Sequence, residues 1–230
     1  HIEAGLRSFN RRMPEEVNRI LCDHISTLLF CPTETSIKNL KEEGITSGVE
    51  HVGDIMYDGI LYYQEKANQT ILDYLCIEPN NYILATVHRA ENTDNPARLK
   101  TIFQALSNTA DVIETVVLAL HPRTRKALSD KGIQLPKQIK VIEPTPYLET
   151  ISLLKNAKAI MTDSGGIQKE AFFLQTPCLT LRDETEWLET IDCGANQLIG
   201  ADKKKTSQAI EKLLSEEWKP DFSGKPYGPG

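Results

Sequence analysis

The alternation of short β-like runs with amphipathic helices is the feature that most constrains the fold of this chain. Each apolar run is followed by a segment whose apolar residues lie three or four positions apart, the spacing of a helix packed on one face. Five or six such βα units in a row require a parallel sheet covered by helices on both faces. The sequence therefore predicts an α/β fold with a Rossmann-like sheet. Its expected strands are YILATV (82–87), TVVLAL (115–120), IKVIEP (139–144), AIMTD (159–163), CLTLRD (178–183) and NQLIGA (196–201).

The residues before this sheet follow the same pattern less completely. TLLFCPT (27–33) is typical of a buried strand, and the helix expected over 34–44 ends at Gly44, a favourable residue for a helix C-terminus. Residues 51–59 indicate a connector, and residues 60–75 a helical segment. Position 1 is not Met, and HIEAGL is typical of the end of a strand, so we expect the chain to begin inside a domain.

Composition excludes several classes of function. With 26 Lys and Arg against 32 Asp and Glu, the net charge of −6 argues against nucleic acid as the main partner. No apolar run approaches the roughly 18 residues of a membrane span, so we expect no membrane association. The cysteines are odd in number, scattered and without CxxC spacing, which favours packing as small apolar side chains in a reducing, cytoplasmic compartment. No disulfide, zinc or other metal site is expected at Cys22, Cys31, Cys76, Cys178 or Cys193.

The strongest candidate for a ligand site is the SGG turn after AIMTD. In parallel sheets, ligands bind outside the carboxyl ends of the strands. Ser164, Gly165 and Gly166 lie between a strand and a helix, where backbone N–H groups carry partial positive charge and glycines let a phosphate come close. Glu170, one turn into the helix, could accept hydrogen bonds from ribose hydroxyls. The alternative is an ordinary βα turn with Asp163 or Ser164 as N-cap.

Three other strand ends carry ionisable residues. YILATV ends in His88 and Arg89, which suit a diphosphate or a developing negative charge; the alternative is a loop histidine capped by Asn92. TVVLAL ends in His121, followed by Pro and Arg. Arg182 and a cluster of acidic residues follow CLTL, which suits either a polar ligand pocket or a solvated helix start.

The N-terminal segment offers two candidate carboxylates. Glu3 lies among small and apolar residues in HIEAG, where a carboxylate can act as an acid or a base. Pro14 fits the first position of a helix and would put Glu15 and Glu16 in its first turn. For Glu15 the alternative is a structural pair with Arg19 at i, i+4.

Taken together, these motifs resemble one enzyme family. HIEAGLRS, MPEEVNR, LFCPTE, VGD, TVHRAEN, HPR, TDSGGIQKEA, LRDETEW and GAN are similar, in this order, to the UDP-N-acetylglucosamine 2-epimerase family, particularly its non-hydrolysing bacterial type. The resemblance runs from residue 1 to about 200, and TDSGGIQKEA with HIEAGLR is highly specific. It implies two Rossmann-like domains facing across a cleft, as in GT-B glycosyltransferases. We then expect residues 1–50 to be the end of a first domain that is mostly missing, 51–214 a second, UDP-binding domain, and 215–230 a tail returning toward the first.

The resemblance also implies a chemistry. Family members invert C2 of a UDP-linked 2-acetamido sugar without a cofactor: UDP is eliminated as the C2 proton is removed, and its re-addition gives the inverted UDP-sugar, a precursor for surface polysaccharides. The intact enzyme is expected to be a homodimer, and this fragment alone to be inactive. The roles implied are catalytic for Glu3, Glu15 and His88; diphosphate binding for Ser164, Gly165 and Gly166; ribose binding for Glu170; a nucleotide-side contact for Arg182; and binding of a second, activating UDP-sugar for Arg89 and His121.

Two departures bear on the substrate. The family's first domain supplies a further catalytic aspartate and basic UDP contacts that this sequence does not contain. Where many members read T-E-R-P-E, this chain has TEWLE (185–189), and this form with RSFNRRMPEE looks more like the branch acting on UDP-diacetamido uronic acids. Arg7, Arg11 and Arg12, with Asn10, could then line the sugar end of the cleft, or form a solvated basic loop. The same motifs would also suit a hydrolysing epimerase, a GT-B glycosyltransferase or a non-catalytic UDP-sugar sensor.

Overall fold

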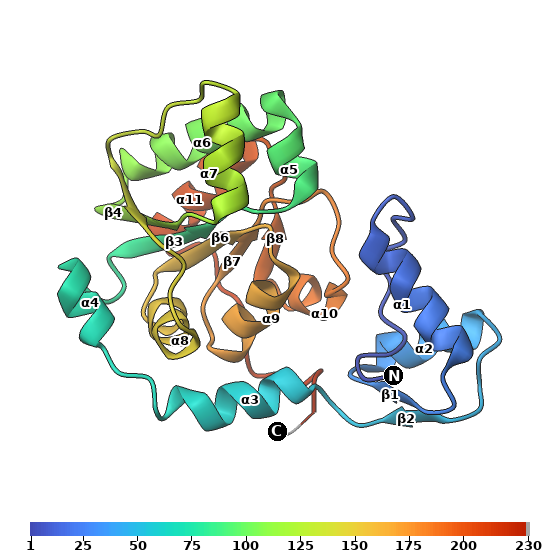
Figure 1. Cartoon of the computed structure of the whole chain (residues 1–230). Coiled ribbons are helices and arrows are strands. Elements are labelled where there is room, and N and C mark those ends of the chain that lie inside the picture. Colours follow the sequence, from blue (N-terminus) through green and yellow to red (C-terminus); the bar gives the residue numbers. More distant parts are fainter. Residues whose placement is uncertain (229–230) are drawn as a thin grey trace.

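The computed structural model describes residues 1–228 and consists of a small unit, residues 1–51, joined by a linker to a large α/β unit (Figure 1). The small unit has two helices and two parallel strands; the second helix packs against both strands, and Ile2 bridges to Phe30 beside them. The prediction that Gly44 ends the second helix is confirmed, since Gly44 follows that helix with the left-handed φ of +80°. The elements of the small unit are α1 (Pro14–Ile25), β1 (Leu29–Cys31), α2 (Glu34–Glu42) and β2 (Val49–His51).

The large unit contains a six-stranded parallel sheet in the order β5-β4-β3-β6-β7-β8, which confirms the predicted α/β fold. All six strands lie within the runs expected from the sequence. The order reverses between β3 and β6, which are neighbours at the centre of the sheet. The strands are β3 (Tyr82–Thr86), β4 (Thr115–Ala119), β5 (Ile139–Ile142), β6 (Ala159–Thr162), β7 (Cys178–Thr180) and β8 (Asn196–Leu198).

Helices cover both faces of this sheet (Figure 1). One apolar core forms between the sheet and α6, α7 and α11, and another between the sheet and α3, α4, α8 and α9. Strand side chains such as Ile83 and Leu84 alternate between the two cores because successive residues point to opposite faces. The helices are α3 (Ile55–Gln64), α4 (Thr70–Leu75), α5 (Ala90–Asp94), α6 (Pro96–Ala110), α7 (Pro122–Asp130), α8 (Tyr147–Lys155), α9 (Gly165–Phe173), α10 (Leu188–Asp192) and α11 (Lys203–Leu214).

Two helices begin where the sequence indicated other structure, and capping explains one of them. α3 starts within the expected connector because the Asp54 side chain accepts a hydrogen bond from the N–H of Met56 at 2.8 Å. α5 occupies the loop expected after His88, and Asn95 ends it and caps α6 through the N–H groups of Ala97 and Arg98.

The C-terminal tail returns along the large unit to the linker. Trp218 donates its indole N–H to the carbonyl of Gly194 at 2.6 Å. Tyr227 packs against Phe172 and Trp187, and its carbonyl accepts the N–H of Asp54 at 3.0 Å. The tail therefore ends beside the linker between the two units.

The cysteines only partly follow the expectation of buried, apolar packing. Cys31 and Cys178 are buried and Cys193 is partly buried, but Cys22 on α1 and Cys76, which ends α4, are exposed. Within residues 1–228 no helix is long and apolar enough to cross a membrane.

Candidate active site

The strand-order reversal places the ends of β3 and β6 side by side, and Asp163 connects them. Its buried carboxylate accepts hydrogen bonds from the backbone N–H groups of His88 and Arg89 and from the side-chain amide of Asn92, all at 2.9–3.0 Å. Nδ1 of His88 lies 3.2 Å from the same carboxylate. Asn92 therefore binds Asp163 and does not cap His88.

The charge on Asp163 orients His88. Burial opposes its ionisation. The hydrogen bond and charge of His88 outweigh burial, together with hydrogen bonds from the Asn92 side chain and the Arg89 backbone, and lower the pKa of Asp163. Because the carboxylate faces Nδ1, the Nε2 atom of His88 is left for a ligand. Local sequence indicates only a possible helix cap for Asp163, since its partners lie more than 70 residues away in the chain.

The SGG turn forms the N-terminus of α9, as expected. The Ser164 side chain accepts the N–H of Ile167 at 3.4 Å, so Ser164 is the N-cap. At Gly165 an added Cβ would lie 2.8 Å from Oε1 of Glu186, 3.4 Å from the indole nitrogen of Trp187 and 3.5 Å from Arg89. A side chain here would have to displace the Glu186 carboxylate, because polar side chains converge on the Gly165 Cα.

A cleft of about 800 Å³ separates the small unit from this helix end. Seven of the ten predicted site residues line it: Glu3, Glu15, His88, Arg89, Ser164, Gly165 and Gly166. Its walls also include basic groups from both units: Arg12 and Arg19 from the small unit, and Arg123 and Lys169 from the large unit. The cleft therefore combines carboxylates, Glu3 and Glu15 among them, with a basic, anion-attracting surface.

His121 lines a second, more apolar pocket of about 170 Å³ that shares His88 with the cleft. The two histidine rings lie 5.6 Å apart. His121 also caps α7, because its Nδ1 accepts the N–H of Arg123 at 3.1 Å. The two hollows thus meet at His88.

Glu170 and Arg182 do not line the cleft. Glu170 is 7% exposed, and burial raises its pKa to about 7, with hydrogen bonding to Tyr147 and the charge of Lys169 opposing that rise. Arg182 is 1% exposed and pairs with Glu186 at 3.0 Å, so it is not part of a solvated helix start. It supports the cleft from behind, because Glu186 lines the wall.

The predicted alternative for Glu15, a pair with Arg19, is wrong. Arg19 instead contacts Glu16 at 2.9 Å. Glu16 is fully buried and accepts the N–H groups of Ser8 and Phe9, because its side chain turns under the preceding loop. Glu15 is exposed at the cleft and is left for other partners.

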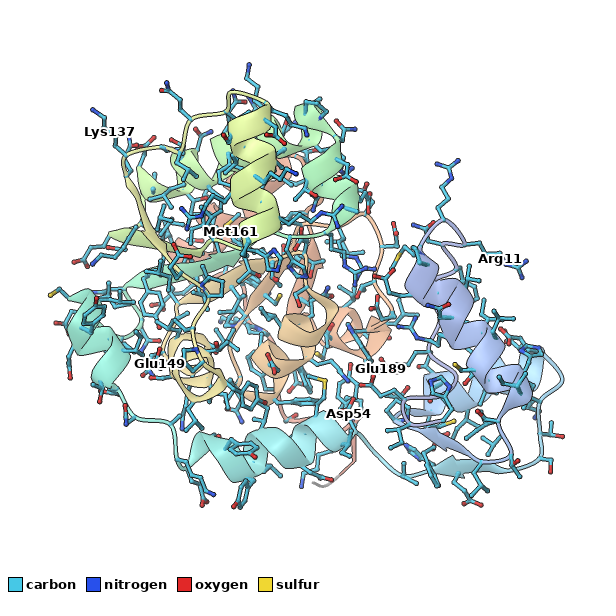
Figure 2. The ribbon with its side chains drawn as sticks, viewed as in Figure 1. Arg11, Asp54, Lys137, Glu149, Met161 and Glu189 are labelled. Carbon is cyan, nitrogen blue, oxygen red and sulfur yellow. The ribbon has the colours of Figure 1, made fainter. Side chains whose placement is uncertain are left out.

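The three arginines that follow Glu3 have different environments in the folded chain. Arg7 is buried, with its donors bound to Asp23, Glu43 and the carbonyl of Leu6, so it cannot bind a sugar. Arg11 is exposed at the outer tip of the small unit (Figure 2). Only Arg12 of the three arginines lines the cleft, together with Asn10.

Comparison with known proteins assigns the family. The family model described as UDP-N-acetylglucosamine 2-epimerase matches residues 1–230. The chain belongs to the UDP-N-acetylglucosamine 2-epimerase family. A UDP-N-acetylglucosamine 2-epimerase homolog of Methanococcus maripaludis is 52% identical over 93% of this chain and 61% of its own length. The UDP-2,3-diacetamido-2,3-dideoxy-D-glucuronate 2-epimerase of Pseudomonas aeruginosa is 47% identical over the whole chain and 64% of its own length.

Solved structures of epimerases in this family have the same fold. The Methanocaldococcus jannaschii UDP-GlcNAc 2-epimerase in complex with UDP-GlcNAc and UDP superposes with a TM-score of 0.91 at 42% identity, over all of this chain and 65% of that one. The Neisseria meningitidis enzyme bound to UDP-GlcNAc gives 0.85 at 33% identity, over 99% of this chain and 65% of that one. The chain thus spans just under two thirds of these family members.

Sequence reasoning missed three residues of this epimerase-family site. Lys169 and Trp187 line the cleft, and Asp54 contacts Lys169 from the linker. Lys169 carried one available signal, since it and Glu170 are the charged residues of a helix that is otherwise apolar or neutral. Trp187 differs from the family's usual motif, but that difference alone does not place its ring in the cleft.

Proposed function

We propose that the intact natural protein epimerises C2 of a UDP-linked 2-acetamido sugar without a cofactor, of the UDP-N-acetylglucosamine to UDP-N-acetylmannosamine type. One observation carries this proposal: two carboxylates, Glu3 and Glu15, line the same cleft as a glycine-rich helix end beside basic groups. Such a site can both bind a diphosphate and move protons at the adjoining sugar. The family and its UDP-GlcNAc-bound members support the choice of substrate class.

The diphosphate is proposed to bind at the start of α9. Backbone N–H groups after Ser164 and the guanidinium of Arg89 supply donors there, and Gly165 leaves room for phosphate oxygens. The pocket shared through His88 would take the uracil, with Glu170 near the ribose. Arg89 is therefore proposed as a substrate contact, in preference to the activating site that the resemblance implied.

The proton chemistry is proposed for the carboxylates. One carboxylate accepts the C2 proton, the C–H electron pair forms the C1–C2 double bond, and the C1–O bond breaks with its electrons leaving on UDP. His88, oriented by Asp163, donates a hydrogen bond to the departing diphosphate. Re-addition of UDP after protonation of the opposite face gives the inverted sugar.

Glu15 and Glu16 provide a matched test of this chemistry. In the intact natural protein incubated with UDP-N-acetylglucosamine in deuterated water, NMR should show deuterium entering C2. We expect E15Q to lose at least about 100-fold of this exchange while its melting temperature stays unchanged, since proton transfer contributes on that scale. E16Q should instead lower the melting temperature, because it weakens the buried contacts of Glu16 with Ser8, Phe9 and Arg19. Normal exchange in E15Q would reduce Glu15 to a helix-start residue.

The same experiment separates the remaining activities. Free N-acetylmannosamine would identify a hydrolysing epimerase, and binding without exchange a UDP-sugar sensor. Sugar transfer to an added acceptor would identify a glycosyltransferase. Light scattering of the intact protein tests the proposed homodimer, and fractionation of cells tests the proposed cytoplasmic location.

A second candidate substrate is a UDP-diacetamido glucuronate. The Pseudomonas aeruginosa relative with that name matches the whole chain, and Arg12 lies in the cleft beside Asn10. A carboxylate at C6 needs charged donors when it is buried. If the uronate is the substrate, the intact protein should prefer it over UDP-N-acetylglucosamine by much more than tenfold in kcat/KM. R12Q should then reduce this preference by weakening the uronate, whereas R11Q should leave the preference unchanged.

A further inference from the structure

Lys169 is a fully buried lysine whose partners come from three separate parts of the chain. Its ammonium pairs with the carboxylate of Glu3 from the small unit and, at 2.7 Å, with that of Asp54 from the linker. It also lies 4.2 Å above the ring of Trp187. Figure 2 shows Asp54 where the linker passes between the two units.

The two carboxylates differ in a way that suggests different roles. The Asp54 side chain is fully buried, and its other oxygen caps α3 through the N–H of Met56. The Glu3 side chain is 38% exposed and lines the cleft. Asp54 is thus the permanent partner that a buried ammonium requires, and Glu3 is the partner that a ligand can reach.

The backbone at Glu3 is held in a costly conformation. Its φ is +63°, in the left-handed region that non-glycine residues avoid at a cost of about 1–2 kcal/mol. The next residues fix it: Ala4 donates to the carbonyl of Phe30 at 3.0 Å, and Gly5 donates to the buried carboxylate of Asp23 at 3.0 Å. This conformation aims the Glu3 side chain out of the small unit toward Lys169.

We propose that Lys169 is a positioning residue that holds Glu3 at the cleft, ready to accept a proton from C2 of the sugar. The proposal rests on the proposed epimerase function. The ion pair fixes where the Glu3 carboxylate lies at the cleft, because Lys169 is itself held by the buried Asp54. When Glu3 takes the proton and becomes neutral, Lys169 keeps its pair with Asp54, so no unpaired charge is buried. The contact also links the two units, so Glu3 is in position only when they are together.

The kinetic test uses Lys169→Met in the intact natural protein. We expect kcat for C2 exchange to fall about 100-fold, the scale of a misplaced reacting group, while UDP affinity changes less than about threefold. Lys203, exposed at the start of α11, supplies the matched control: Lys203→Met should behave as the unaltered protein.

A second variant separates positioning from folding. K169M leaves Asp54 buried without its cation, so it should lower the melting temperature by about 10 °C. The double variant K169M/D54N removes that buried charge and keeps a residue that caps α3 well, so much of the melting temperature should return. Exchange should stay low. Full recovery of exchange together with stability would overturn the proposal, because Lys169 would then be only structural.

A test that does not depend on activity distinguishes this proposal from failure of the proposed function. In a double-mutant cycle of melting temperatures, K169M and E3Q should be non-additive by at least a few degrees, since directly contacting groups couple. If the unaltered protein exchanged no C2 proton, the epimerase proposal would fail, and this cycle would still measure whether Lys169 holds Glu3. Additive losses of melting temperature would show that the two side chains do not interact, and would contradict the proposal.

Discussion

At the scale of single residues, neighbouring carboxylates in this chain have opposite environments. Glu16 is buried and bound on several sides, whereas Glu15 faces the cleft. Glu186 is buried as well, but the charge of Arg182 outweighs burial and lowers the pKa of the Glu186 carboxyl. Glu170 has no such pairing of comparable strength, so burial dominates and its pKa rises to about 7. Which carboxylates are charged near neutral pH thus depends on their partners.

The raised pKa of Glu170 predicts a pH-dependent stability. Its contribution is fully present below the unfolded pKa of about 4.5 and is lost as pH rises through about 7, because ionising the buried group then opposes folding. Relative to E170Q, the unaltered chain should lose about 3 kcal/mol of unfolding free energy between pH 4.5 and 8. Urea unfolding at both pH values checks this.

The exposed Glu211 on α11 supplies the control, since E211Q should show no such trend. A difference between E170Q and the unaltered chain that is the same at both pH values would mean that Glu170 is not the group that titrates.

At the scale of elements, the first turn of α9 combines a cap with an open helix end. Ser164 satisfies one N–H group, and the glycines that follow leave the remaining N–H groups accessible from the cleft. The glycines are not equivalent. A Cβ on Gly165 would meet Glu186, Trp187 and Arg89, whereas one on Gly166 would approach only the end of Met56, at 3.7 Å, and the Ser164 hydroxyl, at 4.0 Å.

Gly165→Ala and Gly166→Ala therefore form a matched pair. Both should leave the helix intact, because alanine is the better helix former. G165A should weaken UDP binding by at least about tenfold, since a methyl group would displace Glu186 and occupy phosphate space; tenfold corresponds to about 1.4 kcal/mol. G166A should weaken it less. Calorimetric titration measures both, and equal affinities for the two variants would argue against a phosphate site at Gly165.

At the scale of the whole molecule, the two units differ in how they are stabilised. The large unit has a six-stranded sheet between two apolar cores. The small unit has two strands, a core cluster of Ala4, Leu29, Cys31 and Leu40, and a buried polar network around Arg7. It contacts the large unit through Glu3 and Lys169, through Asn10, which donates to Glu184 at 2.6 Å, and through the buried Leu6, which packs in an apolar cluster with Phe172, Trp187 and Tyr227.

This difference predicts unequal protection from amide hydrogen exchange. Backbone N–H groups of β1 and α1 should exchange faster than those of β3 and β4, because little apolar surface supports the small unit. Exchange measured by mass spectrometry on this chain checks the expectation. K169M should speed exchange further around Glu3 and leave β4 unchanged. Equal protection in both units would show that they unfold together.

The sequence by itself determined the parallel α/β fold and the edge of the sheet that carries the site. Both follow from local information: apolar spacing reveals each strand and helix, and consecutive βα units bring the strand ends to one edge. For that reason His88 and the SGG turn could be singled out before any contact was known.

Only the tertiary structure decided what each ionisable side chain does there. In the folded chain Arg7 is buried in ion pairs, and Glu16 is buried while Glu15 stays at the cleft. Glu170 and Arg182 lie outside the cleft lining. Lys169 contacts Glu3, 166 positions away in the chain. Neither the spacing of apolar residues nor secondary-structure propensity predicts these outcomes. The charge state and reach of a carboxylate or an ammonium are fixed by burial and by partners distant in sequence, which exist only once the chain has folded.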